Sequence, residues 1–270
     1  GPARVARAVA SWARRYPLAP RWPAAQRINL TTDDGVRLGG AYLPGPVGAR
    51  ATVVLVHGFA NSSRTPGIHA FAHVLASHAA VIVVELRGHG RSGGTSTLGW
   101  KEPLDVAAAV VAAPAGRPVV TVGVSLGGAV ALLHASTHGG VAGVVAVSAP
   151  AWWGDLGTTG ANRINWALRT RAGRMVLSGL LGTRVALDCS HTPSAADAPP
   201  VSEPFVIVAH DPDDWYFGPE HAEAIHQWAK GPSELWWYPG AGHGTDLLTT
   251  AFASRLQALL DERLGAPARR

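Results

Sequence analysis

One stretch constrains this chain more than any other: an apolar strand, a tight turn that carries a serine, and a helix follow one another directly. The strand is predicted over the β-branched run 119–122, the turn over 123–127 (Gly-Val-Ser-Leu-Gly), and an alanine-rich helix over 129–135. Such a turn needs glycines, because larger side chains at its two ends would collide with neighbouring segments. It exposes Ser125 and aims the N–H of Leu126 at the place where negative charge would collect on an attacked carbonyl oxygen. The alternative is a serine in an ordinary strand–helix turn.

The composition is that of a single large globular domain. The chain has 270 residues, 47% of them hydrophobic, and no interior linker or repeat divides it. A single cysteine, Cys189, excludes an internal disulfide framework. The formal net charge of +5 comes mainly from arginines spread along the chain, without the interleaved aromatic residues of nucleic-acid binding proteins. We therefore expect no nucleic-acid partner.

Residues 1–27 form a basic amphipathic segment, in which Gly1-Pro2 is typical of the scar left when a protease removes a tag. Two interpretations apply to it: a helix packed on its own domain, which we favour, or a segment in peripheral contact with an anionic membrane surface. No apolar run is long enough to span a bilayer, and no signal-peptide pattern opens the chain. We expect a cytoplasmic protein, although a signal or anchor removed with an earlier N-terminus stays open.

Strands and helices alternate on both sides of the serine turn. A β-hairpin is predicted over 28–32 and 37–43, followed by strands over 51–56, 81–86, 119–124, 141–147, 205–209 and 234–238. Helices are expected over 67–78, 100–113, 129–135, 220–230 and from about 246 to 264. Fully apolar strands indicate burial on both faces, and their alternation with helices indicates parallel crossovers.

Several sequence blocks, in this order, resemble those of the α/β-hydrolase superfamily in its serine esterase and lipase-like form. They are His57-Gly58-Phe59, then 87–92, 123–127, 210–214 and 240–243. The resemblance covers nearly everything from 28 to 264. It implies an α/β fold with an eight-stranded, mostly parallel sheet flanked by helices and a helical lid inserted after the sixth strand. The hydrolase core would then comprise 28–150 and 201–270, and the lid 151–200.

The resemblance also implies a catalytic triad of Ser125, His243 and Asp214. Ser125 would be the nucleophile, and His243 the general base that takes its proton and later protonates the leaving group. A carboxylate would fix the tautomer of the imidazole and stabilise its cation. Where the family has His-Gly-x-x-Asp, this chain has His-Asp-Pro-Asp-Asp at 210–214. We predict Asp214, which keeps the family's offset, with Asp211, which could instead cap the turn, and Asp213 as alternatives.

The oxyanion hole would use the backbone N–H groups of Leu126 and Phe59. Trp152 and Trp153 directly follow the sixth strand and are candidate substrate-binding residues. The lid adds two kinds of residue: apolar Trp166, Leu168, Met175, Val176, Leu177, Leu180 and Leu181, and basic Arg163, Arg169, Arg171, Arg174 and Arg184. One interpretation is an apolar acyl pocket whose arginines attract an acidic group, and the other an ordinary lid with its arginines in solvent.

We expect neither a cofactor nor a metal, and interpret His69 and His73, four apart on a helix, as surface or packing residues. The predicted function is hydrolysis of a carboxylic ester or thioester with a partly apolar acyl group, through an acyl-enzyme. Carbon–carbon bond hydrolases, amidases and acyltransferases keep the same triad and remain alternatives. A non-catalytic ligand-binding member of the fold is a further alternative, from a different functional class.

Overall fold

The structure of the chain is a computed structural model that describes residues 25–153, 168, 170–186 and 192–265. Nearly all of the N-terminal segment expected at 1–27 lies outside these residues. So do Arg163, Trp166 and Arg169 of the expected lid. The two interpretations of the N-terminal segment therefore stay predictions.

An eight-stranded sheet organises the described chain, with the strand order β1-β2-β4-β3-β5-β6-β7-β8. The strands are β1 (Gln26–Thr31), β2 (Arg37–Leu43), β3 (Thr52–Val56), β4 (Ala80–Val84), β5 (Val119–Val124), β6 (Gly143–Val147), β7 (Phe205–His210) and β8 (Ser233–Trp237). β2 pairs antiparallel with β1 and β4, and every other pair is parallel. The predicted fold class, an eight-stranded and mostly parallel α/β-hydrolase sheet, is confirmed.

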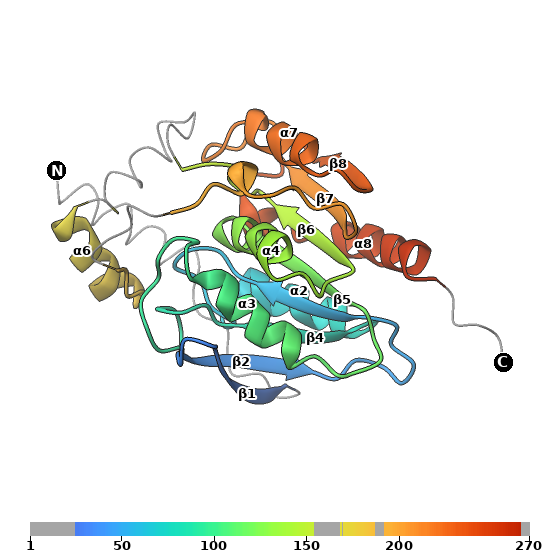
Figure 1. Cartoon of the computed structure of the whole chain (residues 1–270), viewed down its shortest axis with the longest axis horizontal. Coiled ribbons are helices and arrows are strands. Elements are labelled where there is room, and N and C mark those ends of the chain that lie inside the picture. Colours follow the sequence, from blue (N-terminus) through green and yellow to red (C-terminus); the bar gives the residue numbers. More distant parts are fainter. Residues whose placement is uncertain (1–24, 154–167, 169, 187–191, 266–270) are drawn as a thin grey trace.

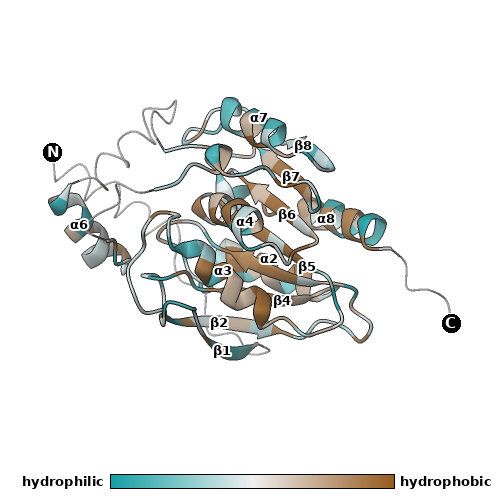
Figure 2. Cartoon of the chain, in the orientation of Figure 1, coloured by the Kyte–Doolittle hydropathy of each residue, from teal (hydrophilic) through white to brown (hydrophobic). Residues whose placement is uncertain are grey.

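Strand side chains alternate between two apolar cores, one on each face of the sheet. Val53 and Leu55 of β3 belong to one core, and Val54 and Val56 belong to the other. Every residue of β3 is buried, which explains why the strand reads as a continuous apolar run instead of an alternating one. Figure 2 shows the same pattern, with apolar residues concentrated on the central strands and polar ones on the outer faces of the helices.

Helices cover both faces (Figure 1). They are α2 (Pro66–Ala76), α3 (Glu102–Val111), α4 (Leu126–Thr137), α7 (Pro219–Trp228) and α8 (Thr250–Arg263). α2 and α8 supply Phe71 and Phe252 to one core, and the two rings lie 5.7 Å apart. α3, α4 and α7 pack on the opposite face. Among the described residues, no helix has both the length and the apolar character needed to cross a bilayer.

The last helix begins later than the sequence predicts. Residues Gly244–Leu247 form a separate short 3-10 helix, η2, and α8 starts only at Thr250. The break has a local cause, because Leu248 adopts a non-helical backbone and the Thr249 side chain caps α8 by accepting a hydrogen bond from Phe252 N at 3.2 Å. A helix predicted from about 246 is therefore wrong at its N-terminal end.

The insert between β6 and β7 contributes α6 (Arg171–Leu181) and a short 3-10 helix, η1 (Ala195–Asp197), to the described structure. Thr170 caps the start of α6 by accepting from Gly173 N at 3.1 Å, and Gly182 ends it in the left-handed conformation. In Figure 1, α6 lies at one side of the molecule, beyond the sheet.

Candidate active site

The three predicted triad residues lie at the carboxyl ends of β5, β7 and β8, which belong to the run of parallel strands β5-β6-β7-β8. Ser125 follows β5, Asp214 lies in the loop after β7, and His243 lies in the loop after β8. In open α/β sheets this edge is where ligands bind. Residues far apart in the chain are thus brought to one place by the strand order alone.

The turn between β5 and α4 holds Ser125 at a backbone angle of φ = 53°, in the left-handed region that residues other than glycine rarely adopt. Close packing around the turn requires the glycines. A Cβ added at Gly123 would lie 2.2 Å from the carbonyl oxygen of Gly127, and one added at Gly127 would lie 2.3 Å from that of Val56. The N–H of Ser125 donates to Val147 O at 2.8 Å, which ties the turn to β6.

Ser125 and Asp214 each lie within hydrogen-bonding distance of the His243 ring, on opposite ring nitrogens. His243 Nε2 lies 3.1 Å from Ser125 Oγ, and His243 Nδ1 lies 2.6 Å from Asp214 Oδ2. The Asp214 side chain is fully buried, whereas the His243 side chain keeps 16% of its surface exposed. With Nδ1 donating to the carboxylate, Nε2 is the acceptor that can take a proton from the hydroxyl.

The other two candidate acids make different contacts. Asp211 accepts from the N–H groups of Gly242 at 2.6 Å, Asp213 at 2.9 Å and Gly240 at 3.1 Å. Burial opposes the ionisation of Asp211, but these donors outweigh it and lower its pKa. Asp213 is exposed. Asp211 thus fastens the loop that carries the imidazole, and of the three carboxylates only Asp214 contacts His243 among the described residues.

Ser148, which the sequence analysis did not single out, holds the other side of that loop. It directly follows β6, is fully buried, and has a positive φ of 49°. Its Oγ accepts a hydrogen bond from Gly244 N at 3.0 Å, one residue after His243. The sequence signal is weak, because a serine after an apolar strand is common and only the fold brings it beside residue 244.

The loop after β3 runs beside Ser125. A Cβ added at Gly58 would lie 3.3 Å from the Cβ of Ser125, so the backbone that leads into Phe59 passes close to the serine. As the first residue of α4, Leu126 has an N–H without an acceptor inside the helix. Both predicted oxyanion donors therefore belong to segments adjoining the hydroxyl.

Two buried histidines support this loop. His57 Nε2 accepts from Leu86 N at 3.1 Å, so its Nδ1 carries the proton and donates to Gly58 O at 2.7 Å. The His89 ring packs edge-on against the rings of His57 at 5.1 Å and Phe59 at 5.5 Å. Burial lowers the pKa of both histidines, that of His89 to about 3, so both are neutral near pH 7.

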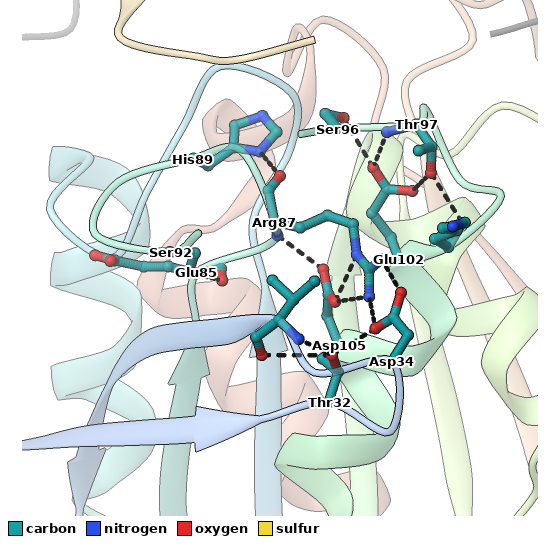
Figure 3. A network of polar contacts seen from close by, with 12 residues as sticks. Thr32, Asp34, Glu85, Arg87, His89, Ser92, Ser96, Thr97, Glu102 and Asp105 are labelled. Atoms are coloured by element: carbon teal, nitrogen blue, oxygen red, sulfur yellow. Dashed lines mark hydrogen bonds and ion pairs between the residues drawn. The ribbon is translucent and has the colours of Figure 1, made fainter. Parts of the chain in front are cut away.

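An ion-pair network fixes the loop after β4 (Figure 3). The Arg87 guanidinium donates to Asp105 at 2.7 Å and to Asp34 at 2.8 Å. Burial raises the pKa of Asp105 to about 7 against the opposing effect of Arg87, whereas hydrogen bonds from Arg87 lower that of the more exposed Asp34 to about 2. Glu102 accepts from Ser96, Thr97 and Gly99. These contacts stabilise the loop and do not reach the triad candidates.

Aromatic side chains surround His243. Tyr216 and Phe217 have ring centroids 4.5 Å and 5.5 Å from the His243 ring. Of the predicted substrate-binding residues, Trp153 packs against Phe217, and Trp152 packs against His221 at 4.3 Å. Trp153 thus contacts a residue whose ring lies next to His243. No sequence signal marks Tyr216 and Phe217, because they lie in a loop, where no periodic pattern indicates which side chains face the site.

Besides Arg171, which is exposed, the structure describes two lid arginines, and both make contacts of their own. Arg184 donates from Nε to Gly94 O at 3.0 Å and from Nη2 to Ser92 O, and Arg174 donates from Nη1 to Leu168 O at 3.0 Å. Each side chain thus binds main-chain carbonyls. The rings of His69 and His73 have centroids 4.7 Å apart and are tilted by 57°. Within the described ranges, no three His, Cys, Asp or Glu side chains gather in a way that could hold a metal ion.

Several of the solved structures similar to this chain are esterases. An esterase from Pyrococcus furiosus has 22% identity and a TM-score of 0.72, with 93% of this chain and 100% of that chain covered. An esterase from Rhodococcus has 23% identity and a TM-score of 0.69, and the match covers 88% of this chain and 99% of that one. A thermophilic esterase from Thermogutta terrifontis, solved with malate bound, has 21% identity and a TM-score of 0.67. The match covers 89% of this chain and 100% of that one. These likenesses show a common fold. No curated protein matches the chain.

Residues 48–203, more than half of the 270-residue chain, match the family Hydrolase_4, described as serine aminopeptidase, S33. The matched range includes Phe59 and Ser125, while Asp214 and His243 lie beyond it. The match agrees with the sheet order and with the serine turn between β5 and α4. The chain therefore belongs to the Hydrolase_4 family, a family of serine hydrolases with the α/β-hydrolase fold.

Proposed function

We propose that this protein hydrolyses carboxylic esters or thioesters through an acyl-enzyme on Ser125, with His243 as general base and acid and Asp214 as the triad carboxylate. The observation that carries the proposal is the contact chain from hydroxyl to imidazole to carboxylate, with distances of 3.1 Å and 2.6 Å. The esterases among the similar structures support ester substrates by analogy of fold.

In the first half-reaction, His243 Nε2 takes the proton of Ser125 Oγ as the oxygen attacks the carbonyl carbon. The N–H groups of Leu126 and Phe59 stabilise the oxyanion. When the tetrahedral intermediate collapses, the bond to the leaving group breaks and Nε2 returns the proton to that group. Water then repeats the sequence on the acyl-enzyme, which releases the acid and restores Ser125. Asp214 holds the imidazole in the required tautomer and stabilises its cation.

Apolar contacts around the predicted oxyanion loop support a partly apolar acyl group. Phe59 packs against a small buried cluster of Leu98, Leu168 and Val185, to which Leu181 of α6 also contributes. The insert after β6 therefore places apolar side chains next to the loop that would bind the acyl carbonyl. Arg174 and Arg184 bind main-chain carbonyls, which for these two favours an ordinary lid over arginines that attract an acidic group.

A chain-length series tests the substrate class. We expect measurable kcat/KM on p-nitrophenyl esters and acyl-CoA thioesters, with a rise as the acyl chain lengthens from acetyl, because the added methylenes enter apolar surroundings. The Ser125→Ala variant is the control and should be inactive on every member. Uniform inertness of the wild-type protein would contradict ester hydrolysis and favour carbon–carbon or amide substrates.

The second candidate function is ligand binding without catalysis on the same scaffold. Its specific expectation is tight, reversible retention of an apolar ligand by a protein whose Ser125 does not react. The contacts of Ser125 with His243, and of His243 with Asp214, favour the enzyme, because a binding protein has no need of an imidazole oriented by a buried carboxylate.

A further inference from the structure

The run Trp215-Tyr216-Phe217, hereafter the aromatic run, leads from solvent to the candidate imidazole. Phe217 is buried at 6% exposure, Tyr216 is partly buried, and Trp215 is 55% exposed. The Trp215 ring lies 3.9 Å from the Tyr216 ring at an interplanar angle of 38°, and the Tyr216 ring lies 4.5 Å from that of His243. These contacts make a continuous aromatic surface that starts at the imidazole and ends in solvent.

Backbone hydrogen bonds hold the aromatic run in place on both sides. Asp214 Oδ1 accepts from Tyr216 N at 2.8 Å, and His210 Nε2 donates to Phe217 O at 3.0 Å. Phe217 also packs edge-on against His221 of α7, with centroids 5.4 Å apart. The loop that also supplies the carboxylate thus holds the backbone of Tyr216 and Phe217, and the Trp215 ring rests on that of Tyr216, so stacking of an aromatic group would need little reorganisation of the backbone.

The chemistry of acyl transfer separates the two ends of a substrate. The acyl carbonyl must lie at the N–H groups of Phe59 and Leu126, whereas the leaving oxygen must come within reach of His243 Nε2, because that nitrogen gives it a proton. The aromatic run contacts His243. A large group on an oxygen held at His243 Nε2 is therefore within reach of the Tyr216 and Trp215 rings.

We propose that Trp215 and Tyr216 bind a planar aromatic leaving group, so that the substrates are aryl or arylmethyl esters. The inference deepens the proposed function and rests on it. A flat ring stacks offset on an indole or phenol face and gains more than an aliphatic group of the same area. The large exposed fraction of Trp215 leaves its surface accessible to such a ring. Trp215 and Tyr216 are specificity residues in this scheme and take no part in proton transfer.

Two inhibitors that leave the same adduct on Ser125 test the proposal. One is an alkyl fluorophosphonate, and the other is the corresponding alkyl 2-naphthyl phosphonate. In both, Ser125 Oγ forms a bond to phosphorus; fluoride leaves in the first and naphthol, protonated by His243, in the second. We expect Trp215→Ala to lower the ratio of the naphthyl to the fluoride rate constant by roughly three- to tenfold. Trp215→Phe keeps a flat ring and should restore most of it.

Trp100→Ala is the matched control, because Trp100 is also an exposed tryptophan, at 50%, and its Lys101 contact is unrelated to His243. This variant should keep the wild-type ratio. An unchanged ratio in Trp215→Ala, or an equal fall in Trp100→Ala, would overturn the proposal. If the wild-type protein reacts with neither phosphonate, the proposed function fails and the aromatic-run proposal falls with it. If the protein reacts with both phosphonates but Trp215→Ala leaves the ratio of their rate constants unchanged, the aromatic-run proposal is refuted and the proposed function stands.

Discussion

At the scale of single residues, the loop after β7 contains three carboxylates that differ in what each one touches. Asp214 Oδ2 contacts His243 Nδ1 at 2.6 Å, Asp211 accepts backbone N–H groups of residues 240 and 242, and Asp213 is exposed. The family offset from His210 predicts Asp214, the carboxylate that contacts His243. A turn-capping Asp211 is the alternative, and Asp211 does accept from Asp213 N. Its contacts with Gly240 and Gly242 could not be predicted, because they depend on a loop about thirty residues further on.

Replacement of the triad acid tests this assignment. We expect Asp214→Asn to lower kcat by about 10⁴-fold, because an amide leaves His243 in the wrong tautomer. Asp213→Asn is the matched control and should leave kcat close to wild type. The comparison is made on one p-nitrophenyl ester, after circular dichroism has shown that both variants fold. A large loss in Asp213→Asn with a small one in Asp214→Asn would reassign the acid.

A second residue-scale prediction concerns Ser148. Ser148→Ala removes the acceptor of Gly244 N and leaves a buried donor unsatisfied, at a cost of about 1–3 kcal/mol of stability. Because Gly244 adjoins His243, we expect kcat to fall more than KM changes. Ser148→Thr, which keeps the hydroxyl, should restore part of kcat if its methyl group is accommodated. Wild-type kcat in Ser148→Ala would show that the hydrogen bond has no positioning role.

At the scale of elements, the strand–turn–helix unit of β5 and α4 is the best predicted part of the chain. Its glycines and apolar strand signal both the geometry and the chemistry, because no other residues fit so close to β3. The last helix was less predictable. The sequence predicts its start at about residue 246, where the structure instead has η2 and then the Thr249 cap, and the Ser148 hydrogen bond to Gly244 holds the chain in the His243 loop there.

The turn glycines carry a prediction about packing between elements. A Cβ at Gly127 would lie 2.3 Å from Val56 O and 2.6 Å from His57 O, both rigid backbone atoms. We expect Gly127→Ala to push α4 away from β3, to reduce stability by at least about 2 kcal/mol, and to abolish activity. Urea unfolding measures the stability.

Gly179→Ala in α6 is the control for that substitution. Gly179 is an exposed helical residue with open space where a Cβ would go. Alanine there should stabilise the protein by about 0.5–1 kcal/mol, because it has the higher helix propensity. Equal and small effects of the two substitutions would contradict the close packing described for the turn.

At the scale of the whole molecule, buried histidines couple stability to pH. Burial lowers the pKa of His57, His89, His134 and His210, that of His134 to about 4. The unfolded chain binds protons at these groups as the pH falls below about 6.5, while the folded chain does not. Their contribution to stability is therefore complete above that pH and is lost progressively on acidification. Neither the burial nor its consequence could be deduced from the sequence, because the sequence does not show which histidine side chains the fold removes from solvent.

His134→Leu measures one of these contributions away from the triad candidates. His134 lies on α4 at 1% exposure, and its Nδ1 has no hydrogen-bond partner among the described residues. With its pKa lowered from 6.5 to about 4, we expect the variant to lose less stability over that pH range than the wild type, by up to about 3 kcal/mol. Urea unfolding at pH 7.5, 6 and 4.5 provides the comparison. Parallel stability profiles of the two proteins would contradict it.

The most direct test of the account is the reaction of the intact protein with a fluorophosphonate, followed by mass spectrometry of its peptides. We predict one adduct per chain, located on Ser125, and a labelling rate that falls by orders of magnitude in His243→Ala although Ser125 is still present. An unlabelled Ser125 in folded wild-type protein, or a rate that does not depend on His243, would contradict the central claim that these side chains form a working nucleophile.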